Sequence, residues 1–242
     1  TPYATLVDAT LERGTMPCVV PQLKSITIGG AVSGLGIESS SFRHGLVHET
    51  VLEMDVLLAT GDVVTCTPDN EHRDLLHGLP NSYGTLGYVL KLKARTLPVT
   101  GFVRLQHHRH DRPSSFFADL EAKCSSDADF VDGVIFSPDE FYVSEAHHVA
   151  SAPATSDYTL EHIYYRSIRE KRADFLTTHD YLWRWDSDWF WCSKNFGLQN
   201  PLLRRLAGRR RLNSVTYTKI MRWNGRHDWT GKLDRLRGLH SE

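Results

Sequence analysis

Paired cysteines, long apolar runs and an excess of charge of one sign are all missing from this chain of 242 residues. Its cysteines lie far apart and form no C-x-x-C pair, which argues against a disulfide framework and against a zinc site. A reducing, cytoplasmic compartment is therefore expected. Lys and Arg total 28 against 29 Asp and Glu, so no overall charge attracts nucleic acid, and no nucleic-acid partner is expected.

Segments that enter a membrane are also missing from the sequence. No apolar run approaches the ~20 residues that cross a bilayer, and the first residues do not follow a signal-peptide pattern. Any membrane association is therefore expected to be peripheral. A basic amphipathic patch over Leu202–Leu206 and Arg209–Arg211 is compatible with a solvated helix end and with attraction to anionic lipid headgroups.

The most distinctive stretch that is present runs from Thr27 to Ser41, where four glycines and a run of serines interrupt ordinary globular sequence. Gly29 and Gly30 lack Cβ atoms and tolerate positive φ, and the apolar residues after them are suited to open a short helix that favours a phosphate. The spacing Gly-Gly-x-x-x-Gly-x-Gly is neither the P-loop nor the Rossmann fingerprint. From spacing alone, a phosphate-binding loop and a glycine-rich turn between two strands both stay open.

A resemblance to a known family separates these alternatives. Thr27 to Ser41 follows the pattern T-[IV]-G-G-x-x-x-G-x-G-I-E-S-S-S, and similarity continues through Glu53–Asp55, Cys66–Pro68 and Gly84–Gly87. These residues resemble the FAD-linked oxidase superfamily, in the branch that contains Δ24-sterol reductases. The resemblance implies an α+β fold, in which the second lobe of a PCMH-type FAD-binding domain is followed by part of an α+β substrate domain.

The resemblance also implies FAD as the cofactor and two groups of residues that bind it. The first group places its backbone against the pyrophosphate and the flavin and consists of Thr27, Ile28, Gly29, Gly30, Ala31, Val32, Ser33, Gly34, Leu35, Gly36, Ile37, Glu38 and Ser39. The second group consists of Gly84, Gly87 and Tyr88, for which an ordinary strand entry is the alternative.

The ends of the sequence suggest a piece of a longer protein. Thr1 is not an initiator methionine, and the matching region begins inside the FAD domain of the family. We therefore expect residues 1–98 to form a partial FAD-binding domain and residues 99–242 a partial substrate domain. Because a preceding lobe supplies another phosphate-binding loop in the family, we expect this chain alone to bind FAD weakly or not at all.

Hydrophobic patterning predicts several strands. Val51–Leu58 and Val63–Thr67 predict a hairpin with its turn at Ala59–Asp62. In Tyr88–Thr96, apolar Leu90, Leu92 and Ala94 alternate with basic residues, which predicts a strand with one buried face.

The sequence after residue 98 predicts an α+β unit with strands at Phe102–Gln106, Phe130–Phe136 and Phe141–Ala146 and a helix at Pro113–Lys123. The histidines at 107, 108, 110, 147 and 148 invite a metal interpretation. No carboxylate or cysteine completes a ligand set beside them, so no metal site is expected.

Four tryptophans lie within residues 183–191, in a stretch that begins at His179. The stretch predicts either an aromatic core helix or one wall of an apolar pocket. At helical spacing Tyr181, Arg184 and Asp188 share a face, so a packed helix with an Arg–Asp pair is one interpretation. Because Tyr181 and Arg184 match the family pattern, the resemblance favours these two as the catalytic residues.

Taken together, these expectations describe a flavoprotein that moves a hydride between NAD(P)H, FAD and a carbon–carbon double bond of a lipid. The resemblance allows two lipid substrates, a sterol side-chain alkene and the methylene-branched acyl chain that similar actinobacterial proteins reduce. The Trp-rich segment and the many arginines favour the second. A flavin-dependent alcohol or sugar oxidase and an inactive remnant are the alternatives.

Overall fold

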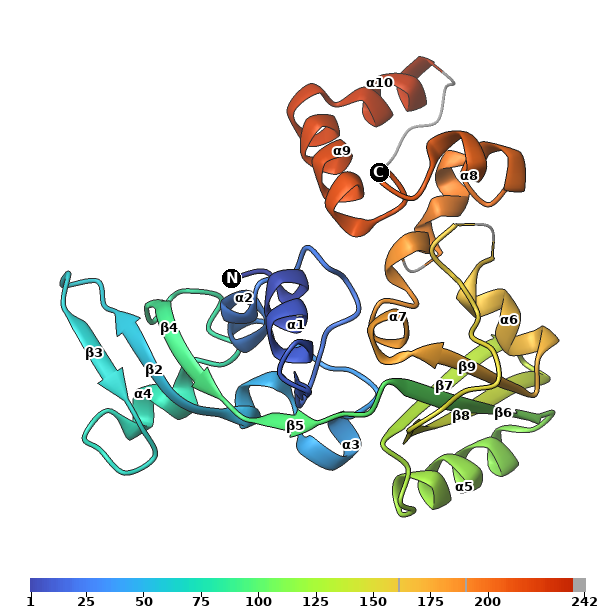
Figure 1. The fold of residues 1–242 in the computed structure, drawn as a ribbon. Helices are drawn as coiled ribbons and strands as arrows, with labels where there is room; N and C mark the ends of the chain where they lie inside the picture. The colour runs from blue at the N-terminus through green and yellow to red at the C-terminus, as the bar shows by residue number, and fades with distance from the viewer. Residues whose placement is uncertain (161, 190, 237–242) are drawn as a thin grey trace.

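The computed structural model describes residues 1–160, 162–189 and 191–236, and Figure 1 shows two groups of strands with helices between and beyond them. The elements up to residue 98 are α1 (Tyr3–Leu11), β1 (Thr15–Pro17), α2 (Ile28–Ser33), α3 (Ser41–His44), the 3-10 helix η1 (Val47–Thr50), β2 (Val51–Leu57), β3 (Val63–Cys66), α4 (Arg73–Gly78), β4 (Tyr88–Ala94) and β5 (Thr96–Pro98). Strands β1 and β5 form an antiparallel pair, and β3, β2 and β4 form an antiparallel sheet in that order.

The predicted hairpin is confirmed, because β2 and β3 pair in antiparallel register from Met54–Cys66 to Leu57–Val63. The prediction for β4 is wrong at Leu90, whose side chain is 59% exposed. Asp55 pairs with Lys91 and the next residue of β2 pairs with Val89, so Leu90 lies in a bulge without a partner. A bulge interrupts the two-residue alternation on which the sequence prediction depended.

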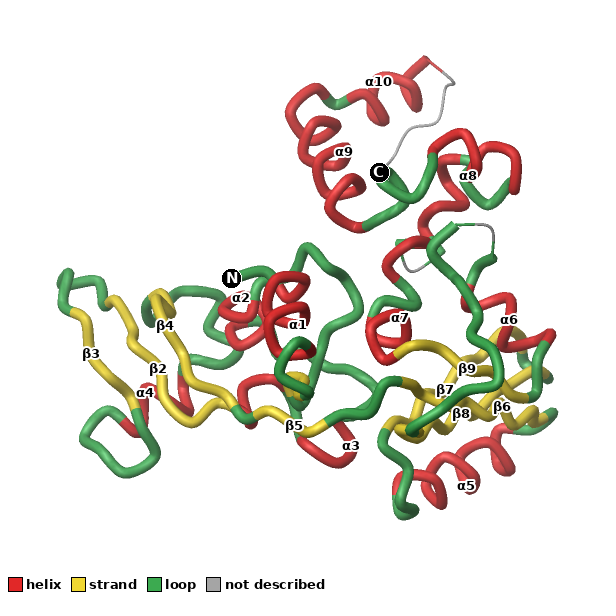
Figure 2. Tube along the Cα trace, viewed as in Figure 1, coloured by secondary structure: helices red, strands yellow, loops and turns green. Residues whose placement is uncertain are grey.

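The following elements form a second sheet with a helix on one face (Figure 2). They are β6 (Phe102–His110), α5 (Pro113–Cys124), β7 (Phe130–Ser137), β8 (Glu140–Val149), α6 (Tyr164–Glu170) and β9 (Ala173–Thr177). The strand order is β7-β8-β6-β9, and all pairs are antiparallel. Phe116 of α5 packs with Phe141 and Val143 on one face, whereas Tyr142 belongs to the larger core on the other face. The α+β prediction is confirmed.

The larger hydrophobic cluster includes residues from both sheets, from Val7 and Met54 near the start to Leu105 and Tyr164 further along. A single cluster that spans both groups of strands does not mark a boundary between them. The domain boundary at residue 98 stays a prediction.

The remaining elements are α7 (Thr178–Leu182), the 3-10 helices η2 (Asp186–Asp188) and η3 (Cys192–Phe196), α8 (Pro201–Ala207), α9 (Ser214–His227) and α10 (Trp229–Leu236). The Trp-rich segment is not one helix, because α7 ends at Leu182 and Trp189 has a φ of 52°. Trp183, Trp185 and Trp189 are buried, whereas Trp191 is half exposed. Within the described ranges, no helix is long and apolar enough to cross a bilayer.

The histidines of β6 contact neighbouring side chains rather than one another. A ring nitrogen of His107 lies 2.7 Å from the hydroxyl of Ser144, and one of His108 lies 3.1 Å from a carboxylate oxygen of Glu145. In the part of the chain that the structure describes, no three metal-binding side chains come together.

Candidate functional site

The glycine-rich segment folds into the short helix α2, which leaves part of its backbone uncovered. Thr27 caps the helix by accepting a hydrogen bond from the backbone N–H of Gly30 at 3.1 Å. Thr27, Gly30 and Gly34 are all exposed and are spaced by three and four residues, so they share one helix face. Because two of the three have no side chain, this face offers bare backbone to a ligand.

Gly29 and Gly30 do not use the positive φ that glycine tolerates, because both have ordinary helical backbone. The reason for glycine is space. A Cβ on Gly30 would lie 3.0 Å from the Thr27 hydroxyl, and a Cβ on Gly36 would lie 2.9 Å from a methyl group of Val47. Glycine at position 36 therefore lets the segment pack closely against Val47 and Ala31.

A groove of about 570 Å³ separates the second half of this segment from the edge strand β7. It is lined by Pro21, Gln22, Leu23, Ile26, Gly34, Leu35, Gly36, Ile37, Glu38, Ser39, Val131, Asp132 and Gly133. The last six residues of the first predicted cofactor group thus lie along one wall of a single groove. We refer to it as the glycine groove.

A smaller groove of about 380 Å³ lies beside the first half of the segment. Its lining includes Thr27, Ile28 and Gly29 on one side and residues 89–92 of β4 on the other. The second predicted group, Gly84, Gly87 and Tyr88, lines neither groove and precedes this part of β4. Gly84 and Gly87 have φ values of 86° and 154°, which favour glycine in this turn.

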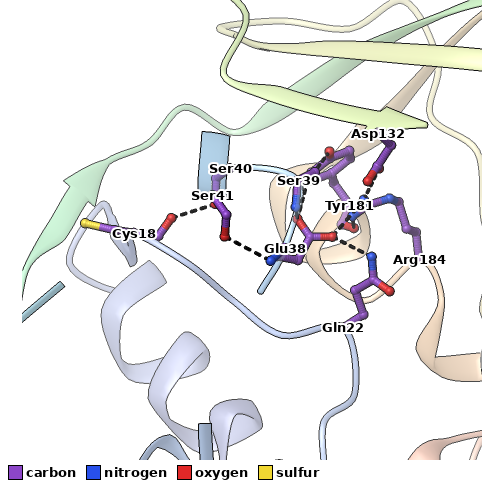
Figure 3. A network of polar contacts seen from close by, with 9 residues as sticks. All are labelled: Cys18, Gln22, Glu38, Ser39, Ser40, Ser41, Asp132, Tyr181 and Arg184. Carbon is purple, nitrogen blue, oxygen red and sulfur yellow. Dashed lines mark hydrogen bonds and ion pairs between the residues drawn. The ribbon is translucent and has the colours of Figure 1, made fainter. Parts of the chain in front are cut away.

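A polar network reaches the glycine groove through Gln22, Glu38, Ser39 and Asp132, which line it. Figure 3 shows the side chains of this network. Arg184 lies at its centre, fully buried, and one terminal nitrogen donates to Glu38 at 2.9 Å and to Asp132 at 2.6 Å. Its other terminal nitrogen donates to the backbone oxygen of Tyr181 at 2.9 Å. Gln22 donates to the same oxygen of Glu38 at 2.7 Å. The network thereby fastens the glycine-rich segment to β7 and to the chain after α7.

Tyr181 lies beside this network and is also buried. Its hydroxyl is 3.3 Å from the hydroxyl of Ser39, and the guanidinium of Arg184 lies 4.1 Å from its ring centre. Burial raises the pKa of Tyr181 well above its ordinary value, so the phenol keeps its proton at neutral pH. Tyr181 does not line the glycine groove, whereas Ser39 does. The two predicted catalytic residues therefore contact groove-lining residues: Tyr181 contacts Ser39, and Arg184 contacts Glu38.

Asp132 has an unusual electrostatic environment. Burial raises its pKa to about 6, and the nearby carboxylate of Glu38 acts in the same direction, while Arg184 opposes both. Two carboxylates thus share one guanidinium, and the carboxyl group of Asp132, which lines the glycine groove, has a pKa raised to about 6.

The partners of Arg184 differ from those expected from sequence. The Arg184–Asp188 pair is wrong, because the chain leaves helical geometry after Leu182 and Asp188 instead contacts Ser193 and Arg204. Asp132 and Gln22 were missed by sequence reasoning. No local spacing connects them with Arg184, since Asp132 lies 52 residues away along the chain and is brought close by the sheet.

The described residues suit a flavin cofactor. The uncovered glycine face of α2 admits close approach of a phosphate to the backbone, and the glycine groove offers apolar side chains such as Leu35 and Val131 to a flat ring. Arg184 offsets part of the charge of the two carboxylates beside the groove. Residues 27–39 would hold FAD mainly through backbone atoms.

Comparisons with known proteins agree with this geometry. Residues 1–67 match a family model described as an FAD binding domain. The chain is 28% identical to the human Delta(24)-sterol reductase over 215 residues, which cover 80% of this chain and 40% of that protein.

Two further relatives align over shorter stretches. Delta(24)-sterol reductase of Pisum sativum is 34% identical over 144 residues, covering 53% of this chain and 25% of that protein. Cytokinin dehydrogenase 7 of Oryza sativa is 33% identical over 138 residues, covering 55% of this chain and 26% of that protein.

The chain therefore spans between 25% and 40% of the length of these three relatives. Its matching region contains the glycine-rich segment, whose uncovered backbone and groove have the features that an FAD-binding domain needs. Residues 1–67 are thus similar to an FAD binding domain, and the chain is similar to Delta(24)-sterol reductases and to a cytokinin dehydrogenase.

Proposed function

We propose that this chain works in an FAD-dependent oxidoreductase that reduces a carbon–carbon double bond of a lipid. The observation that carries the proposal is the glycine groove, which joins the matched FAD-binding segment to β7 over the Arg184 network. Relatives named as sterol reductases support an alkene as the reacting group. When bound, FAD supplies hydride transfer between NAD(P)H and the double bond.

The residues of the chain have separate tasks in this proposal. Residues 27–39 would hold the cofactor, and Arg184 positions Glu38 and Asp132, which line the glycine groove. Reduction of an alkene also needs a proton at the second carbon. We propose Tyr181 as its source, because its protonated hydroxyl lies 3.3 Å from Ser39, which lines the groove.

The finer substrate assignment is a methylene-branched acyl chain, with a sterol side chain as the other lipid candidate. An apolar chain offers few hydrogen-bonding groups, so burial holds it, at roughly 0.8 kcal/mol per methylene. The half-exposed Trp191, next to buried Trp185 at 5.9 Å between ring centres, is the part of the Trp-rich segment that is open to such a chain.

A flavin-dependent oxidase or dehydrogenase is the second candidate function. It is supported by the similarity to proteins named cytokinin dehydrogenases at 33% identity. FAD supports both reduction of an alkene and oxidation of an alcohol or amine, so only an assay with each class of substrate separates the two candidates. An inactive remnant is the third possibility and predicts no turnover with either class of substrate.

The experiment uses a protein that contains this chain and the preceding lobe of the FAD-binding domain, so that FAD is retained. It is supplied with NADH or NADPH and with a methylene-branched lipid or a sterol bearing a side-chain double bond, and products are identified by mass spectrometry. The proposal expects reduced lipid, and Tyr181→Phe should slow lipid reduction while sparing reduction of the flavin by the nicotinamide. Oxidation of an alcohol or sugar without any lipid reduction would establish the second candidate instead.

We also propose a reducing, cytoplasmic location with peripheral membrane contact. The cysteines support the first part, since Cys18, Cys66, Cys124 and Cys192 are all free thiols in the fold. Cell fractionation tests the location directly. The native protein should appear in the cytosolic and membrane-associated fractions, and protease added to sealed membranes should digest it.

A further inference from the structure

The C-terminal helices α8, α9 and α10 differ in charge from the rest of the chain. Residues 201–242 carry 11 Lys and Arg against 3 Asp and Glu, whereas residues 1–200 carry 17 against 26. The near-neutral total therefore conceals an acidic body joined to a strongly basic segment. Figure 1 shows α9 and α10 lying away from both sheets. We refer to α8–α10, residues 201–236, as the basic arm.

One face of α9 carries a strip of unpaired positive charge. Lys219, Arg222 and Arg226 follow one another by three and four residues, so they lie on the same face, and all three are exposed. Within the described ranges, none of the three pairs with a carboxylate, in contrast to Arg235, which contacts Asp228 at 2.7 Å. The charge of the strip is therefore available to an external anion.

Two half-exposed tryptophans sit at the corner between α9 and α10. Trp223 and Trp229 are 52% and 48% exposed, and their rings stack with centres 5.8 Å apart. The side chain of Asn224 fixes the corner, because it both donates to the hydroxyl of Thr230 at 2.9 Å and accepts from its backbone N–H at 3.1 Å. Indole rings held in this way suit the boundary between water and lipid, where Trp is enriched.

Helix α8 adds exposed apolar surface to the basic arm. Leu202 and Leu206 are 67% and 71% exposed and lie on one face, because they are four residues apart. Of the basic residues near them in the sequence, Arg205 is exposed, whereas Arg204 is buried and Arg209 contacts Asp157. Apolar side chains beside basic ones are the combination by which a helix rests on an anionic membrane surface.

A cavity at the foot of the basic arm has the charge to receive an anionic group. Its volume is about 610 Å³, and its charged lining consists of Lys24, Arg209, Arg210 and Lys219 together with Asp180 and Asp186. Arg209 is paired with Asp157, which leaves Lys24, Arg210 and Lys219 as the other cations of the lining. The carboxylate of Asp186 accepts hydrogen bonds from the backbone N–H groups of Lys24 and Ser214 and is thus occupied within the protein.

We propose that the basic arm docks on the face of an anionic lipid bilayer, with Trp223 and Trp229 at headgroup level and the Lys219–Arg226 strip over the lipid phosphates. Attraction of basic residues and burial of exposed aromatic side chains act together in such binding. The docking needs neither FAD nor turnover. Only its use, which is to bring a membrane lipid to the glycine groove, rests on the proposed function.

The experiment measures sedimentation of the protein with vesicles of phosphatidylcholine alone or mixed with phosphatidylglycerol, at low and high salt. We expect binding to the mixed vesicles that weakens with salt. The triple variant Lys219→Gln, Arg222→Gln, Arg226→Gln should lower partitioning by about 100-fold, the effect of three basic residues near an anionic surface. Replacing Trp223 and Trp229 with alanine should also weaken binding.

The matched control is Arg104→Gln, Arg109→Gln, Arg112→Gln, which removes the same charge from exposed positions at and after β6. It should bind mixed vesicles like the wild type, and circular dichroism checks that each variant is folded. Equal binding to neutral vesicles, equal loss in the control variant, or tighter binding to duplex DNA than to vesicles would overturn the proposal. Self-association that the tryptophan variants abolish would assign the surface to a second copy of the chain instead.

Because vesicle binding is measured without flavin or substrate, its failure would leave the proposed reductase standing. Conversely, a protein that binds vesicles but reduces no lipid alkene would retain the docking surface and lose the reductase assignment. The two proposals therefore fail separately.

Discussion

Arg184 is the residue on which the candidate site depends most. Its guanidinium is buried between Glu38 and Asp132, so its loss would leave two carboxylates facing one another without a cation. Removing one partner of a buried ion pair typically costs about 3–5 kcal/mol. The fold and the lining of the glycine groove therefore depend on the same side chain.

Arg184→Met should accordingly lower the free energy of unfolding by about 3–5 kcal/mol, since the methionine fills similar space but carries no charge. Urea unfolding followed by tryptophan fluorescence measures the change. Arg109→Met serves as the control, because Arg109 is exposed and a comparable substitution there should cost less than about 0.5 kcal/mol. Equal stability of the two variants would show that Arg184 does not stabilise the contact between the glycine-rich segment and β7.

Asp132 gives the site a pH dependence whose direction follows from its raised pKa. The carboxyl titrates at about 6 in the folded chain and near about 3.9 when unfolded, so the folded state holds the proton more tightly. Its unfavourable contribution is fully present well above pH 6 and is relieved as the pH falls through 6 toward 4.

Relative to Asp132→Asn, the wild type should therefore gain about 2 kcal/mol of stability on going from about pH 7 to about pH 4.5. Comparing denaturant midpoints of the two proteins across this range isolates the contribution of one group, because other titrating residues are shared. Parallel profiles for the two proteins would mean that Asp132 keeps an ordinary pKa in the folded chain.

At the level of single elements, helix α2 tests the cofactor assignment. Gly30 is exposed on the uncovered face of the helix, and a Cβ there would crowd one neighbour, the Thr27 hydroxyl at 3.0 Å. Gly30→Val should therefore block close approach of a ligand to the backbone while leaving most of the fold in place.

We expect Gly30→Val to reduce FAD affinity by at least about tenfold, which corresponds to about 1.4 kcal/mol. Flavin fluorescence titration measures the affinity in a protein that includes the preceding lobe. Gly225→Val is the matched control, because Gly225 is also a helical glycine and a Cβ at this position would have no atom within 4 Å. Unchanged FAD binding by Gly30→Val would remove residues 27–39 from the cofactor site.

Local sequence patterns predicted some elements well and others poorly, for physical reasons. The β2–β3 hairpin was predictable because its turn contains Gly61, whose φ of 91° suits glycine. The bulge at Leu90 was not, because the register with β2 decides it rather than the composition of β4. The Trp-rich segment has helical spacing, yet α7 ends at Leu182, and Trp183, Trp185 and Trp189 are buried without one continuous helix.

The candidate site shows the same division. The glycine-rich segment is contiguous, so its pattern could be read directly from residues 27–41. The network around Arg184 joins Glu38, Asp132 and Tyr181 from three separate parts of the chain, and no local spacing encodes that meeting. Sequence reasoning therefore found Arg184 but assigned it the wrong carboxylate.

At the scale of the whole molecule, the two groups of strands meet at the glycine groove. The backbone N–H of Val131 in β7 donates to the carbonyl of Ser39 at 2.9 Å, so the edge of the second sheet is tied to the end of the glycine-rich segment. The groove is consequently built from parts of the chain that a cut near residue 98 would separate. Cofactor binding and the substrate side of the protein are expected to depend on each other.

The chain aligns with between 25% and 40% of the relatives described above, and we predict that residues outside it complete the FAD site. The most direct test is the visible absorbance spectrum of the purified chain beside that of a version extended with the preceding lobe. We expect the chain alone to retain little flavin. The extended protein should be yellow with bound FAD, should bleach with NAD(P)H and should regain its colour when a lipid alkene is added. A colourless extended protein would contradict the flavoprotein assignment, and stoichiometric FAD on residues 1–242 alone would contradict the need for a further lobe.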